Sequence, residues 1–130
     1  MSIERIAAEL ALLREGGIEA VHFPEQQLVL YHNVPTAGER LSLPGTSSVV
    51  VPVPGGYPAT AIDLAGLPVG SPLIGRARGN PNGPVVAAGG QSFQLISFHP
   101  FGNEGGVWDP SRQGFHTYYM WVRTWLSYLN

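Results

Sequence analysis

The chain has 130 residues and a mass of 13.9 kDa, a length typical of one domain, residues 1–130, with a core of its own. A net charge of −2 leaves no basic surface for nucleic acid or anionic lipid, and the lack of cysteine excludes disulfides, thiolate zinc sites and a cysteine nucleophile. No apolar run approaches the ~18 residues of a membrane span, and the first residues are unlike a signal peptide. We therefore expect a cytoplasmic protein that binds neither nucleic acid nor membrane and needs no cofactor.

The first segment is expected to form a short amphipathic helix. Ser2 is a suitable N-cap, and the pair Gly16-Gly17 is a suitable end. The apolar residues between them fall at helical spacing: Ile3, Ile6, Ala7, Leu10 and Leu13. The apolar side of this helix must pack against the rest of the chain.

Strand patterns follow this helix. Residues 21–23 and 28–31 are expected to be strands joined by a turn at 24–27, and residues 32–43 are expected to form a long hairpin connection. Residues 47–53 are β-branched and apolar, but Pro52 and Pro54 place this strand at a sheet edge or end it. A turn at 55–58 precedes a short expected strand at 60–64. A further strand is expected at 92–98.

Two long segments rich in glycine are expected to be loops, and a helix closes the chain. The loops span 68–90, which is also rich in proline, and 99–106. Asp109 and Pro110 are suitable to begin the helix, and its apolar face is Phe115, Tyr118, Tyr119, Val122, Trp125, Leu126 and Leu129. The order predicts an α+β fold: an N-terminal helix, an antiparallel meander of about four strands, a long Gly/Pro-rich connection and a C-terminal helix, with both helices on one face of the sheet.

Side chains capable of chemistry are few and spread out. His99 lies where a strand enters a glycine-rich loop, and His116 lies on the last helix; each is a candidate acid, base or ligand, or a hydrogen-bonded structural residue. The acids from residue 60 onward are Asp63, Glu104 and Asp109. The hydroxyl candidates for a nucleophile, none in a G-x-S-x-G motif, are Ser92, Ser97, Ser111 and Thr117.

Two function classes follow from these residues alone. One is a module that binds a protein or peptide through the loops 68–90 and 99–106 and exposed Tyr and Trp side chains, without catalysis. The other is a small hydrolase whose metal would be held by His99, Asp109 and His116 if they converge. Tyr57-Pro58 and Trp108 also have plain structural interpretations, as a turn and as a core anchor.

The order of elements, with Tyr57-Pro58 after the meander and a Trp-x-Pro at Trp108–Pro110, resembles the ubiquitin-conjugating-enzyme (UBC) fold. The tail is similar to that of a bacterial branch of ubiquitin-like modification pathways: Ser97-x-His99, a short loop, the Trp-x-Pro, and a helix running from Phe115-His116 to Trp125-Leu126. The resemblance implies a UBC-like domain, a role in bacterial conjugation and antiviral defence, and two partners, a ubiquitin-like protein and its activating enzyme. Tyr57, Pro58, Trp108 and Asp109 would be scaffold or binding residues.

The chain departs from the family at its reactive positions. Where the family has Gly-x-(aliphatic)-Cys, the nearest segment here is Gly90-Gln91-Ser92-Phe93, and the His-Pro-Asn motif has only a partial counterpart in Asn80-Pro81-Asn82. A thioester carrier is therefore impossible. Two roles remain: an adaptor, or an oxyester carrier in which Ser97 or Ser92 replaces cysteine and His99, or His116 for Ser92, acts as base. All seven basic residues are arginine, which fits both a GC-rich genome and avoidance of an amine nucleophile.

Overall fold

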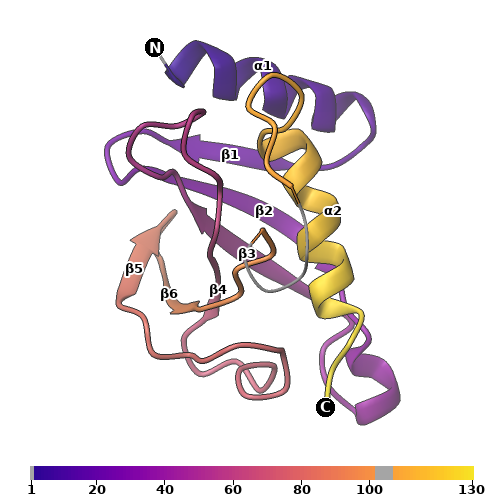
Figure 1. The fold of residues 1–130 in the computed structure, drawn as a ribbon. Helices are drawn as coiled ribbons and strands as arrows, with labels where there is room; N and C mark the ends of the chain where they lie inside the picture. The colour runs from indigo at the N-terminus through magenta and orange to yellow at the C-terminus, as the bar shows by residue number, and fades with distance from the viewer. Residues whose placement is uncertain (1, 102–106) are drawn as a thin grey trace.

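The computed structural model describes residues 2–101 and 107–130, and within them it is an α+β protein. Two helices, α1 (Ser2–Glu15) and α2 (Phe115–Leu126), accompany one antiparallel sheet (Figure 1). The strands are β1 (Ala20–Phe23), β2 (Leu28–Pro35), β3 (Thr46–Pro52), β4 (Ala65–Pro68), β5 (Val85–Ala88) and β6 (Gln91–Ile96). Their order across the sheet is β1-β2-β3-β4-β6-β5.

The N-terminal helix is confirmed, and so is its end at the glycine pair. Ile6, Leu10 and Leu13 are buried on one side of α1. After Glu15, Gly17 adopts φ 82°, and this turn lets the N–H of Ile18 donate to the carbonyl of Leu13. A left-handed residue of this kind favours glycine, which explains why the helix stops there.

Strand β2 is longer than the sequence indicates. The turn at 24–27 joins β1 and β2 as expected, but β2 continues to Pro35, so the predicted connection over 32–43 is wrong in its first part. A break in register between Tyr31 and Val34 allows this, with Asn33 in the left-handed region at φ 52°. A short 3-10 helix, η1 (Gly38–Leu41), fills part of the remaining connection.

The second half of the sheet differs from the expected meander. Residues 60–64 are not a strand; β4 begins at Ala65 and pairs with β6. Position 66 of β4 favours glycine, because a Cβ atom there would lie 2.8 Å from the Val50 side chain and 2.9 Å from that of Leu95. Strand β5 lies inside the segment 68–90 that was expected to be loop, which makes the sheet six-stranded instead of about four-stranded.

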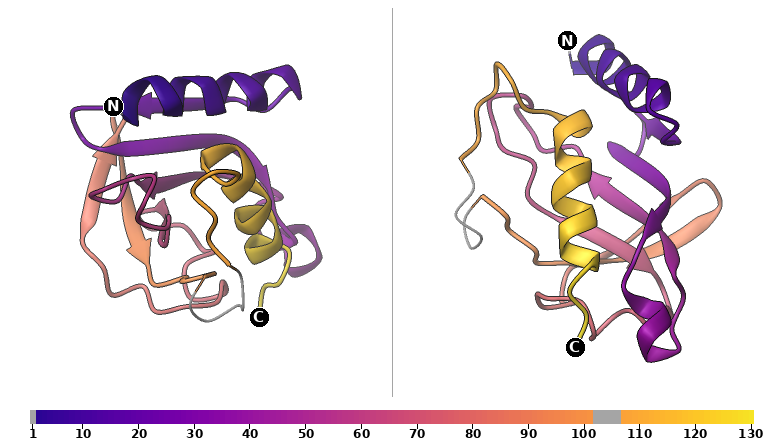
Figure 2. Two further views of the ribbon diagram at one scale, coloured as in Figure 1. Left: turned by 45° about the horizontal axis from the view of Figure 1, so that its top comes forward. Right: turned by 90° about the vertical axis from the view of Figure 1, so that its right-hand side faces the viewer.

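Both helices pack on one face of the sheet, as predicted. Buried residues of α1 and α2 form one apolar cluster with Val29, Tyr31, Val49, Val51, Ala65, Leu67 and Ile96 of the sheet. The β5–β6 hairpin lies away from α2 (Figure 2). A second cluster, Leu28, Leu30, Val50, Ala88, Phe93 and Leu95, fills the opposite face. The sheet curls around it, since a Cβ at Gly89 in the β5–β6 turn would lie 3.4 Å from the Phe23 ring.

Helix α2 begins later than the sequence indicates. The predicted start at Asp109-Pro110 is wrong, because residues 110–112 form a separate turn in which Asp109 accepts hydrogen bonds from the N–H and hydroxyl of Ser111. The helix starts at Phe115, after Gly114. Within the described ranges, neither helix has the length and apolar character needed to cross a membrane.

Candidate functional site

The Tyr57-Pro58 turn and Trp108 lie together at one corner of the molecule. The indole N–H of Trp108 donates to the carbonyl of Pro58 over 2.8 Å, and the peptide bond before Pro58 is cis. The Tyr57 ring centroid lies 6.2 Å from that of Trp108 and 5.1 Å from that of Phe115, the first residue of α2. Two short motifs 50 residues apart in sequence are thus held in direct contact.

A buried carboxylate ties this corner to α1. Glu9 is only 5% exposed, and its Oε1 accepts the Tyr57 hydroxyl at 2.6 Å and the Phe115 N–H at 3.1 Å. Its Oε2 pairs with Arg5 at 2.8 Å, and Arg5 also donates to the carbonyls of Pro110 and Gln113. Glu9 therefore joins α1, the Tyr57 turn and the start of α2.

Glu9 is not among the predicted site residues, although its position in the sequence indicates burial. Position 9 lies three residues after Ile6 and directly before Leu10, within the apolar stripe of the helix. A carboxylate on a buried stripe needs partners, since an unpaired buried charge is costly. Burial and the bond to Glu9 together raise the pKa of Tyr57 well above its ordinary value, so Tyr57 remains a hydrogen-bond donor.

Asp63 and His99 form the most reactive arrangement at the site. Nδ1 of His99 lies 2.5 Å from Oδ2 of Asp63, and the His99 backbone N–H donates to the Asp63 carbonyl at 2.9 Å. Both side chains reach solvent, with exposed fractions of 37% for His99 and 45% for Asp63. An ionised carboxylate only accepts hydrogen bonds, so Nδ1 of His99 is the donor in this contact.

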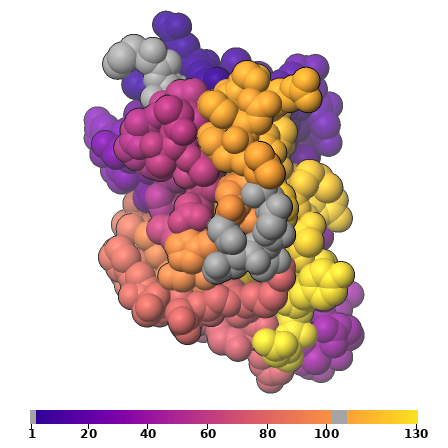
Figure 3. Space-filling view, in the orientation of Figure 1, coloured from indigo at the N-terminus to yellow at the C-terminus, as the bar shows by residue number. Residues whose placement is uncertain are grey.

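Aromatic side chains connect this pair to the Trp108 corner. The Phe101 ring centroid lies 5.3 Å from Trp108, 5.4 Å from Trp121 and 6.3 Å from Tyr118. The Tyr118 hydroxyl donates to the carbonyl of Leu64, next to Asp63. In the space-filling view, the segment 107–114 (orange) borders the segment around Tyr57 (magenta) on one face (Figure 3).

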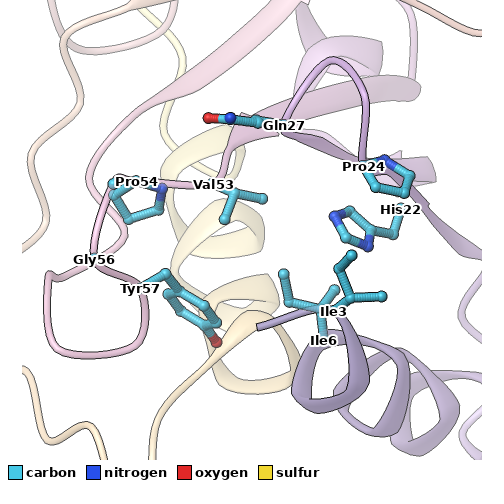
Figure 4. Close-up of a pocket in the computed structure, with 10 residues that line it drawn as sticks. Ile3, Ile6, His22, Pro24, Gln27, Val53, Pro54, Gly56 and Tyr57 are labelled. Carbon is cyan, nitrogen blue, oxygen red and sulfur yellow. The ribbon is translucent and has the colours of Figure 1, made fainter. Parts of the chain in front are cut away.

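Two cavities flank these residues. One, of about 420 Å³, is lined by Pro52, Pro54, Thr60, Ala61, Asp63 and Leu64. The other, of about 280 Å³, lies between α1 and the Tyr57 turn (Figure 4); its lining is Ile3, Ile6, His22, Pro24, Gln27, Val53, Pro54, Gly55, Gly56 and Tyr57. Partial burial lowers the pKa of His22 at this second cavity. We call it the α1 recess.

The serine candidates lie outside the Asp63–His99 pair. The hydroxyl of Ser97 bonds to Oδ1 of Asn82 at 3.3 Å, and the Ser97 N–H bonds to the carbonyl of Asn80. Ser92 is exposed and pairs with Ala87 near the β5–β6 turn, at the opposite end of β6 from His99. In residues 2–101 and 107–130, no hydrogen bond joins either serine to His99.

The remaining candidates are dispersed. His116 lies in the first turn of α2 with its Nδ1 buried and without a hydrogen-bond partner in the described part of the chain. Thr117 bonds within the same turn, to Gly114, and Ser111 bonds to Asp109. Glu104 lies outside the described residues, as does most of the predicted loop 99–106.

The convergence of His99, Asp109 and His116 that a metal-dependent hydrolase would require is not seen. His99 pairs with Asp63 and Asp109 with Ser111, and in the ranges 2–101 and 107–130 no three His, Asp or Glu side chains are close enough to hold a metal ion. Comparisons with family models, with curated proteins and with solved structures find no match to this chain.

Proposed function

We propose that this chain is a UBC-like component of a ubiquitin-like conjugation pathway that acts as an adaptor. It would bind the ubiquitin-like protein or its activating enzyme without forming a covalent bond to either. The observation that carries the proposal is the contact between Trp108 and Pro58. The resemblance to the UBC fold depends on the Tyr57-Pro58 and Trp108–Pro110 motifs. Their contact at one corner supports a shared scaffold role for the two motifs.

The geometry supports an adaptor more than an oxyester carrier. A serine becomes a nucleophile when a base accepts its proton over roughly 2.6–3.2 Å. The hydroxyl of Ser97 is directed to Asn82, and Ser92 lies at the far end of β6. The Asp63–His99 pair has no hydrogen bond to a serine in the described residues.

The α1 recess is the surface we assign to the partner. Its lining combines apolar side chains with polar groups, it includes Tyr57 of the corner, and Ile3 at its rim is 52% exposed (Figure 4). Leu12 lies on the same helix and is 54% exposed, but it does not line the recess. Exposed apolar side chains beside a recess are suited to anchor a partner protein.

The experiment mixes the purified chain with a bacterial β-grasp protein that has a glycine-rich tail, with that protein's activating enzyme and ATP. Calorimetry measures non-covalent affinity for each partner, and denaturing gels reveal adducts. We expect binding to at least one partner and no adduct. Ile3→Arg should weaken that binding at least tenfold, and Leu12→Arg should leave it unchanged. Absence of binding contradicts the proposal, and an adduct labile to hydroxylamine supports the carrier role instead.

A second candidate is a peptide-binding module unrelated to conjugation. It is favoured by the partly exposed aromatic group Phe101, Trp108 and Trp121, whose rings meet edge to face. Such rings are typical anchors of peptide interfaces. The affinity measurement separates the two candidates: a module would bind peptides selected from a random library through Trp121, and Ile3→Arg would not affect it.

A further inference from the structure

We propose that Asp63 and His99 form a catalytic pair that activates water for hydrolysis of an uncharged acyl ester or thioester. This activity is independent of the adaptor role, because it uses the Asp63–His99 pair and not the α1 recess.

The first support is that Asp63 holds both the backbone and the imidazole of His99. Asp63 accepts the His99 backbone N–H through its carbonyl and the imidazole Nδ1–H through its carboxylate. His99 lies at φ 52°, in the left-handed region, where histidine is found more often than most non-glycine residues. The imidazole thus has a fixed orientation before any substrate binds, which is the requirement for a general base.

The second support is that no described residue bonds to the other imidazole nitrogen. Nε2 of His99 has no hydrogen-bond partner in the ranges 2–101 and 107–130, and the side chain is 37% exposed. With Nδ1 donating to a carboxylate, Nε2 can take a proton from water, and Asp63 stabilises the imidazolium that results. No serine lies in hydrogen-bond contact with His99 in the described residues, so the nucleophile is water.

The neighbouring cavity indicates the class of substrate. Asp63 lines the cavity of about 420 Å³ whose other lining residues are Pro52, Pro54, Thr60, Ala61 and Leu64. This lining has no positive charge and one carboxylate, which disfavours a phosphate or carboxylate group. His99 is not among the lining residues and is linked to the cavity by its bond to Asp63. An uncharged ester or thioester with a small apolar acyl group suits the lining.

The reaction balances without any other reagent. Nε2 of His99 takes a proton from water while the water oxygen bonds to the acyl carbon. The bond from that carbon to the leaving oxygen or sulfur then breaks, and the imidazolium returns its proton to the leaving group. The products are a carboxylic acid and an alcohol or thiol, and His99 is again neutral.

The test uses p-nitrophenyl acetate as an ester probe and follows release of nitrophenolate at neutral pH. General-base catalysis contributes about 10²-fold or more, so His99→Gln should lower kcat/KM by about 10²-fold. The matched control is His32→Gln, which removes a partly exposed histidine on β2 that lines neither this cavity nor the corner. It should change the rate less than twofold. Circular dichroism confirms that each variant folds.

Asp63 acts as a positioning residue, and its test needs a readout beyond the rate. Asp63→Asn should lower kcat, and nitrogen-15 NMR should show the His99 proton shifting from Nδ1 to Nε2. A second measurement applies if a variant does not fold, because it uses the unaltered protein. Diethyl pyrocarbonate should modify His99 and stop hydrolysis, and hydroxylamine should remove the modification and restore hydrolysis. Equal rates for the unaltered protein and His99→Gln, or hydrolysis that survives modification of His99, would overturn the inference. Loss of partner binding in Ile3→Arg would leave these rates unchanged.

Discussion

The hydroxyl of Tyr57 and the carboxylate of Glu9 lie 2.6 Å apart in the interior, joining a turn to a helix that precedes it by 48 residues. The same carboxylate oxygen accepts the N–H of Phe115, so a side chain of α1 meets the backbone at the start of α2. The corner that carries Trp108 is therefore built on one buried acid.

Replacing Glu9 should destabilise the protein strongly. Glu9→Ala leaves the buried Tyr57 hydroxyl and Phe115 N–H without an acceptor and should lower the free energy of unfolding by about 2 kcal/mol or more. Glu4→Ala, an exposed acid on the same helix, should change it by less than ~1 kcal/mol. Urea unfolding followed by circular dichroism measures both. A loss below 1 kcal/mol for Glu9→Ala would show that the carboxylate is not a structural junction.

Gly114 should not tolerate a methyl group. A Cβ atom there would lie 2.6 Å from the Tyr57 hydroxyl and closer still to the Glu9 carboxylate, and neither of these bonded side chains can move freely. Gly114→Ala should therefore cost about 1–3 kcal/mol. Gly55→Ala is the matched control, because its Cβ meets nothing within 4 Å and should cost less than ~1 kcal/mol. Melting temperatures that are the same for both variants would contradict this packing.

Stability should fall in alkaline solution. Burial raises the pKa of Tyr31, Tyr57 and Tyr118 above the ordinary value of 10.0. In the unfolded chain these groups lose protons near that value, so the folded state holds more protons above it. Their contribution is complete below about pH 10 and is lost as the pH rises further. Urea unfolding between pH 8 and 11, with tyrosinate absorbance, checks this; tyrosinate signal that rises before unfolding would disagree.

The indole N–H of Trp108 should contribute more to the stability of the fold than that of Trp121. Trp108→Phe leaves the Pro58 carbonyl without its donor and should cost about 1 kcal/mol or more. Trp121→Phe keeps a ring against Phe101 and loses no hydrogen bond seen in the described residues, so its cost should stay below that of Trp108→Phe. Chemical denaturation at neutral pH compares the two. Equal losses would mean that ring packing alone accounts for Trp108.

The helices were predictable because their apolar residues recur at local spacing, as at Ile6, Leu10 and Leu13. The start of α2 was not. Asp109-Pro110 is a good local helix start, but the first N–H of α2 is satisfied by Glu9, 106 residues earlier in the chain. A local pattern contains no information about such a partner.

The same limit applies to the sheet and to the site. The segment around Val85 appears as loop because glycine and proline are frequent over 68–90. The strand at Gly66 is not indicated either, and only the close packing of Val50 and Leu95 shows why a glycine belongs in β4. His99 is a candidate from sequence, whereas Asp63 appears there only as one of the few acids after residue 60. Their pairing across 36 residues depends on β4 and β6 lying side by side.

The β5–β6 turn at Gly89 reaches across to Phe23, near the opposite border of the sheet. The second apolar cluster contains residues of β2, β3, β5 and β6. The β1–β2 hairpin and the β5–β6 hairpin therefore bury their apolar side chains fully only when both are in place. Amide hydrogens of β2 and β6 should therefore exchange through one common global opening, at matching rates, instead of through separate fraying of each border. Slow assembly should accompany this cooperativity, because the contacts that close the sheet join distant parts of the chain.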